Sequence, residues 1–198
     1  MGTRNLIAVY IDGQYKIAQY CQWDGYPDGN GVECLKFLRE RMDREKFAES
    51  VRNVEFLTED EERTIRKRYD AENVFTIDGI TRSIKADYPE LSRDTGAKIL
   101  DIIAKKNGHV KLSNQLGFAD DSLFCEWAWV IDFDRNTFEG YQGFNHKPLD
   151  KRERFHSYMD HVPRKYYAVK LVHSWHLHNL PTEEEFLEAF KECEEDSE

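Results

Sequence analysis

Long apolar runs and regularly spaced cysteines are both missing from this 198-residue chain. No stretch approaches the roughly 20 apolar residues of a membrane-spanning helix, and none near the N-terminus has the length of a signal-peptide core. No pair at the C-x-x-C spacing of metal sites occurs among the four cysteines, Cys21, Cys34, Cys125 and Cys193. These absences predict a reduced, cytoplasmic protein without a membrane segment.

Positive charge is in deficit, since 28 Lys and Arg stand against 38 Asp and Glu, a net charge of −10. Binding to nucleic acid or to an anionic membrane relies on Lys and Arg that face phosphates, so this composition argues against both. An acidic protein can still compete with nucleic acid for a basic partner, although solubility alone explains the charge. The expected partner is a small molecule or a protein.

Apolar material is sufficient for a core, because hydrophobic residues make up 40% of the chain and aromatic residues 13%. The length fits one domain. We expect a single α+β domain over residues 1–190, a charge-rich helical segment within it at about 39–90, and an acidic tail at 191–198.

Alternating apolar residues and tight-turn dipeptides predict β-hairpins. The signals give a hairpin of residues 6–11 and 14–20 around Asp12-Gly13, a hairpin of 124–133 and 137–141, and a strand over 166–175. Apolar residues at three- and four-residue steps predict helices. These cover 31–42, 45–51, 59–69, 95–106 with Ser92 or Asp94 as its cap, and 182–190, while 75–84 is ambiguous and compatible with a short helix. The pattern predicts an α+β fold, an antiparallel or mixed sheet with helices packed on it.

One run is distinctive: residues 22–27 read Gln-Trp-Asp-Gly-Tyr-Pro, after Gly-Thr-Arg-Asn-Leu at 2–6 and Ala-Gln-Tyr at 18–20. This N-terminal region resembles a family of bacteria, their phages and some fungi that has no assigned activity. Residues 92–97 and 125–132 are similar to it as well, whereas Cys21 stands where the family has glycine. The resemblance suggests an accessory protein of phage or prophage type.

The loop of residues 22–27 is the best candidate site. Its glycines permit close approach, and the helix that follows near Gly31 is expected to offer free backbone N–H groups. Hairpin pairing brings the start of the first strand beside this loop. The expected ligand-binding residues are Arg4, Asn5, Gln22, Trp23, Asp24, Tyr26 and Glu126.

A structural role for the same residues is the competing interpretation. Asp24 would then hold a turn, Gly25 would supply a positive φ, and Trp23 and Tyr26 would pack on the sheet. Glu126 would pair with an arginine such as Arg4 or Arg93.

Two classes of function compete, a binding or interaction protein and a hydrolase that uses the same loop. A hydrolase would need an N-terminal nucleophile such as Thr3 or Cys21, or a carboxylate acid from Glu126 or Asp132. No set of nucleophile, base and orienting group can be assembled, so binding is favoured.

A short histidine run gives the strongest metal-like pattern. His176 and His178 share a strand face and could bind zinc. No carboxylate lies within their run. We therefore expect no metal site there.

Overall fold

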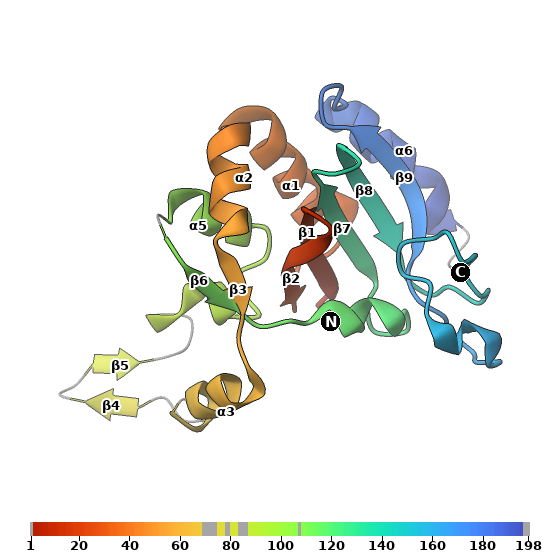
Figure 1. Cartoon of the computed structure of the whole chain (residues 1–198). Helices are drawn as coiled ribbons and strands as arrows, with labels where there is room; N and C mark the ends of the chain where they lie inside the picture. The colour runs from red at the N-terminus through yellow and green to blue at the C-terminus, as the bar shows by residue number, and fades with distance from the viewer. Residues whose placement is uncertain (1, 69–74, 78–79, 83–86, 107, 196–198) are drawn as a thin grey trace.

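A five-stranded mixed sheet forms the centre of the structure, a computed structural model that describes residues 2–68, 75–77, 80–82, 87–106 and 108–195 (Figure 1). The strand order is β2 (Gln14–Cys21), β1 (Asn5–Ile11), β7 (Trp127–Asp132), β8 (Thr137–Gln142) and β9 (Lys170–His176). Strands β1 and β7 are parallel, and the other neighbours are antiparallel. The predicted α+β class with a mixed sheet is confirmed.

Both predicted hairpins form, and local chemistry explains their turns. Asp12 and Gly13 adopt φ values of 52° and 78°, the left-handed pair that a two-residue hairpin turn requires. The carboxylate of Asp134, in the turn between β7 and β8, accepts the N–H groups of Asp12 and Gly13, each at 2.8 Å. The tips of the two hairpins are therefore joined to each other.

Two pairs of short strands lay outside the sequence prediction. Strands β3 (Val54–Phe56) and β6 (Val110–Leu112) form a small parallel sheet. Strands β4 (Phe75–Ile77) and β5 (Ile80–Arg82) pair antiparallel where a short helix was considered, so that assignment is wrong for these residues. Their Thr and Ile side chains favour strands, being branched at the β-carbon. Residues 78–79 and 83–84 of the ambiguous segment lie outside the described chain.

The helices are α1 (Val32–Lys36), α2 (Arg44–Arg52), α3 (Glu59–Arg68), α5 (Lys98–Lys105) and α6 (Glu183–Glu195). Pro27–Gly31 and Phe37–Arg41 form π-helical turns on either side of α1. Helix α6 continues to Glu195, through most of the segment expected to be a tail. Within the described part of the chain, no helix has both the length and the hydrophobicity needed to span a bilayer.

One face of the sheet carries the main apolar core, which side chains of α1, α2, α5 and α6 complete (Figure 1). Trp127 and Trp129 stack with ring centroids 5.6 Å apart, and Phe190 packs edge-on against both. Gly140 makes room for this cluster, since a Cβ there would lie 2.5 Å from the Phe190 ring. Burial of each such side chain contributes about 1.5–3 kcal/mol.

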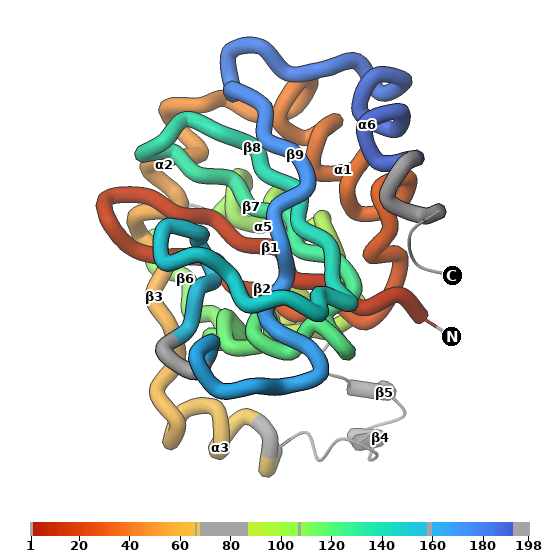
Figure 2. The backbone as a smooth tube through the Cα atoms, turned by 90° about the vertical axis from the view of Figure 1, so that its right-hand side faces the viewer, coloured from red at the N-terminus to blue at the C-terminus, as the bar shows by residue number. Residues whose placement is uncertain are grey.

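Among the described residues, no α-helix contributes to the cluster on the opposite face. This smaller cluster includes Leu6, Val130 and Tyr141, and lies under a 3₁₀ turn, Leu116–Asp120, and the irregular residues 143–169. We call residues 143–169 the strap, because they cross this face between β8 and β9. The strap lies on the side of the molecule turned to the viewer in Figure 2.

Candidate functional site

The start of β1, the end of β2 and the start of β7 meet at one edge of the sheet, as their register requires. Glu126 Oε1 accepts the backbone N–H of Arg4 at 3.1 Å and its Nε at 3.4 Å. The Arg4 guanidinium also lies over the Phe124 ring, 4.8 Å from its centroid. Arg4 and Glu126 are therefore brought together as an ion pair, the structural alternative considered for Glu126.

Hydrogen bonds to neighbouring segments hold the backbone of the loop at residues 22–27. Gly25 N–H donates to the Thr3 carbonyl at 3.0 Å, and the Trp129 indole donates to the Gly25 carbonyl at 3.1 Å. Asp24, not Gly25, has the positive φ, 55°. Gly25 is needed for space instead, because a Cβ there would lie 2.8 Å from the Thr3 carbonyl oxygen.

The backbone N–H groups expected to await a ligand at the next helix are already bonded. Gly29 and Gly31 donate to the Tyr26 carbonyl at 3.1 and 3.3 Å, and Asn30 donates to the Asp24 carbonyl at 2.7 Å. The loop folds back over the helix start and supplies these acceptors itself. The expectation of a free helix N-terminus is therefore wrong.

Asn30 joins this loop to α5. Its Nδ2 donates to the Trp23 carbonyl at 2.8 Å, and its Oδ1 accepts the N–H of Ala97, at the start of α5, at 2.7 Å. Ser92 and Asp94 were the predicted caps, and neither has this role, since Asp94 instead accepts the Trp23 indole N–H at 3.0 Å. Asn30 escaped the sequence analysis because its partner lies 67 residues away.

Asn5 and Gln22 also face inward. Asn5 is buried and donates to the Trp23 carbonyl at 3.3 Å, while its Oδ1 has no hydrogen-bond partner in the described structure. The Gln22 N–H donates to the Arg93 carbonyl at 2.9 Å, and its side chain accepts the Tyr20 hydroxyl. Both residues thus help to hold the sheet edge together.

Several aromatic side chains of this edge remain exposed: Trp23 by 49%, Phe124 by 45% and Phe144 by 42%. Trp23 lies directly over Gly2, where a Cβ would be 2.2 Å from the ring. Phe144 joins the same edge through its N–H, which donates to the Ser122 carbonyl at 2.8 Å, and its ring meets Tyr166 edge-on. We call Trp23, Phe124, Phe144 and Tyr166 the aromatic band. Tyr26, from the same loop as Trp23, is 47% exposed.

Phe144 holds an unfavourable backbone conformation. Its φ is 54°, in the left-handed region that bulky residues rarely adopt. Such strain costs energy and persists only where the surrounding structure enforces it, commonly at functional positions. Nothing in the sequence marks Phe144, because a left-handed position normally carries Gly, Asn or Asp.

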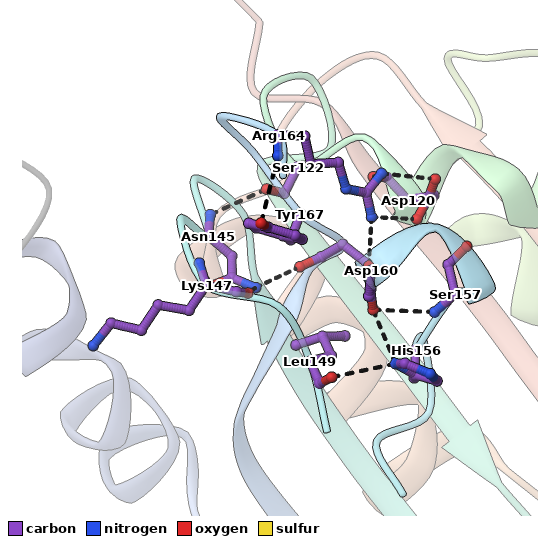
Figure 3. Close-up of polar contacts among 11 residues, drawn as sticks. Asp120, Ser122, Asn145, Lys147, Leu149, His156, Ser157, Asp160, Arg164 and Tyr167 are labelled. Carbon is purple, nitrogen blue, oxygen red and sulfur yellow. Dashed lines mark hydrogen bonds and ion pairs between the residues drawn. The ribbon is translucent and has the colours of Figure 1, made fainter. Parts of the chain in front are cut away.

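Polar contacts fix the strap to the residues that precede β7, among them Asp120 and Ser122 (Figure 3). Arg164 donates to Asp120 at 2.9 Å and to Asp160 at 2.7 Å, and these carboxylates raise the pKa of its guanidinium. His156 Nδ1 lies 3.1 Å from the other oxygen of Asp160. Asn145 N–H donates to the Ser122 hydroxyl at 3.0 Å.

A buried charge cluster anchors the strap to the sheet. The Arg154 side chain, 6% exposed, pairs with Asp132 and Glu139, which are 1% and 5% exposed. Burial acts to raise the pKa of Glu139, but hydrogen bonds from Arg154 and Tyr141 outweigh it, so that the pKa lies below its ordinary value. Asp132, considered as a catalytic acid, is occupied by this ion pair.

The candidate nucleophiles of a hydrolase are enclosed. Burial raises the pKa of the Cys21 thiol to about 12, so this thiol stays protonated near neutral pH. Thr3 is 4% exposed.

His176 and His178 lie close together, with ring centroids 5.4 Å apart, and His176 contacts Asn136. Across the described residues, no group of three or more His, Cys, Asp or Glu is placed to hold a metal ion.

Comparisons with family models, curated proteins and solved structures find no match to this chain. The family resemblance of the N-terminal run therefore stays a prediction. The structure is that of an α+β protein with exposed aromatic side chains at a hydrogen-bonded edge of its sheet.

Proposed function

We propose that the chain is a binding protein that contacts a protein partner through the aromatic band and the adjoining loop at residues 22–27. The observation that carries this proposal is the exposure of three large aromatic side chains, Trp23, Phe124 and Phe144, by 42–49% on one tightly hydrogen-bonded edge. Aromatic residues and arginine are the types that dominate the binding energy of protein interfaces.

Rigidity favours this use of the edge. Trp23 is held by Gly2 beneath it and by Asp94, and Phe124 is held by the Arg4 guanidinium. Side chains that are already ordered lose little conformational entropy when a partner binds. The strained backbone of Phe144 also supports a binding role. A half-exposed phenylalanine contributes little to the stability of the fold, so stability does not explain why the strain is retained.

Charge indicates the chemistry of the partner. Three exposed acids adjoin the band, Asp24, Asp94 and Asp121, and Arg4 is paired with Glu126. A complementary partner surface has an apolar centre and Lys or Arg around it. A host protein bound by a phage-type accessory protein, the role that the family resemblance suggests, fits this description.

Affinity purification from the source cells, with quantitative mass spectrometry, tests the proposal. The double variant Trp23→Ser/Phe124→Ser should fail to capture a protein that the wild-type chain captures. That protein, once purified, should bind the wild type and not the double variant. Leu171→Ser is the matched control, since Leu171 is 41% exposed on β9, outside the band.

Circular dichroism should first show that both variants fold. If every captured protein binds the band variant and the wild type equally, the band is not the contact surface and the proposal fails.

A further inference from the structure

A hollow of about 520 Å³ lies between α3, β6 and the segment that leads into α5, away from the aromatic band. Its size is within the range of small-molecule sites, which are mostly apolar with a few polar groups. Apolar side chains from four segments line it: Leu57, Ile65, Leu91 and Val110.

Glu90 is the unusual group in this wall. Its side chain is only 10% exposed, and one oxygen accepts Lys106 Nζ at 2.7 Å. The other oxygen, Oε2, is buried and has no hydrogen-bond partner in the described structure. A buried carboxylate oxygen without a donor is unfavourable, so a donor that reaches it is bound favourably.

Lys106 pairs with the other oxygen of this carboxylate. The Lys106 side chain is 41% exposed, in contrast to that of Glu90. A positively charged donor is favoured over a neutral one, because hydrogen bonds between charged groups are stronger.

The other acids of the wall are already matched. Glu61 is paired with Lys111, and Asp60 with Arg63 at 3.1 Å. The buried carboxylate oxygen that lacks a donor in the described wall therefore belongs to Glu90, whose other oxygen pairs with Lys106.

We infer that this hollow binds a small organic amine, with its ammonium group on Glu90 and an apolar ring against Leu57, Ile65 and Leu91. This site is separate from the aromatic band, so the two proposals stand or fall independently.

Titration of the ¹⁵N-labelled full chain with 2-phenylethylamine, followed by NMR, tests the inference. Saturable shifts are expected at the amides of Leu57, Leu91 and Val110. Two matched probes separate the contributions: 3-phenylpropanoate keeps the ring but reverses the charge, and ethylamine keeps the charge but lacks the ring. Both should bind far more weakly.

Glu90→Gln, which keeps the side-chain shape, should weaken 2-phenylethylamine binding by at least about tenfold. Glu40→Gln, an exposed acid outside the hollow, should leave it unchanged. Equal binding of all three probes, shifts that do not saturate, or an unaffected Glu90→Gln variant would overturn the inference. If Glu90→Gln does not fold, the probe series on the wild-type chain decides.

Discussion

The two faces of the central sheet are covered in opposite ways. Helices cover one face and meet it through apolar contacts, such as those of Trp129 with Phe186 and Phe190. The strap covers the other face and is held by buried and half-buried ion pairs, with Arg154 and Arg164 at their centres.

A helix satisfies its own backbone hydrogen bonds, so a stripe of apolar side chains is enough to dock it. An irregular segment has no such internal ladder and depends on specific polar anchors. The difference predicts that the strap face is sensitive to pH and to the loss of single charged side chains, whereas the helix face depends on polar side chains only where they bond the end of a helix. Four experiments test this comparison.

Arg154→Met should have the largest effect. Loss of the guanidinium leaves Asp132 and Glu139 buried without their partner, which costs about 3–5 kcal/mol in the free energy of unfolding. Urea denaturation measures it. Arg152→Met, in the same strap but exposed, should change stability by less than about 0.5 kcal/mol. Similar values for the two variants would show that the cluster does not anchor the strap.

The same cluster predicts that the wild type and Arg154→Met differ in how their free energy of unfolding depends on pH. The folded-state pKa of Glu139 is below its ordinary value of 4.5, so its contribution is complete above that pH and is lost as the pH falls through the lower, folded-state pKa. In Arg154→Met the guanidinium no longer offsets the burial of Glu139, so protonation of Glu139 is favoured and acidification should narrow the stability gap to the wild type. Urea midpoints between pH 7 and pH 3 measure both proteins. A gap that is constant with pH contradicts the prediction.

Asn30→Ala tests the connection between the loop and α5. The substitution removes the acceptor of the Ala97 N–H and the donor to the Trp23 carbonyl. The free energy of unfolding should fall by about 1–3 kcal/mol. Asp94→Ala removes the exposed hydrogen bond to the Trp23 indole and should cost only about 0.5 kcal/mol. Thermal denaturation compares the two variants. A larger loss of stability in Asp94→Ala than in Asn30→Ala would show that Asp94, as predicted from the sequence, is the more important cap of α5.

Phe144 gives the smallest and most diagnostic change. Phe144→Gly and Phe144→Ala both remove the ring, but only glycine relieves the left-handed backbone. The glycine variant should therefore be more stable than the alanine variant by about 1 kcal/mol. Both should bind the partner of the aromatic band more weakly. Equal stability of the two would mean that position 144 carries no strain.

Much of the fold could be predicted because its signals are local. Asp12-Gly13 specifies a hairpin turn from two residues. Thr58 with Glu61, and Thr182 with Glu185, form reciprocal caps three residues apart at the starts of α3 and α6. The strand pairs β3–β6 and β4–β5 were not predicted, since three-residue strands show no clear periodicity.

The arrangement of this sheet edge was predicted only in part. Arg4 and Glu126 do meet, although 122 residues separate them, because each precedes a strand of the predicted sheet. The aromatic band, in contrast, includes Phe124, Phe144 and Tyr166, which no motif marks. Exposure of a phenylalanine depends on which neighbours cover it, and that is decided by tertiary packing.

By itself, the sequence determined the α+β class, both hairpins, most helices and the importance of residues 22–27 to the sheet edge. Only the tertiary structure decided that β1 lies parallel to β7, that Asn30 bonds the start of α5, and that Arg154 meets Asp132 and Glu139. The physical reason is the distance along the sequence between the residues that interact. Turns and caps act between residues a few positions apart, whereas these pairings depend on where distant segments come to rest.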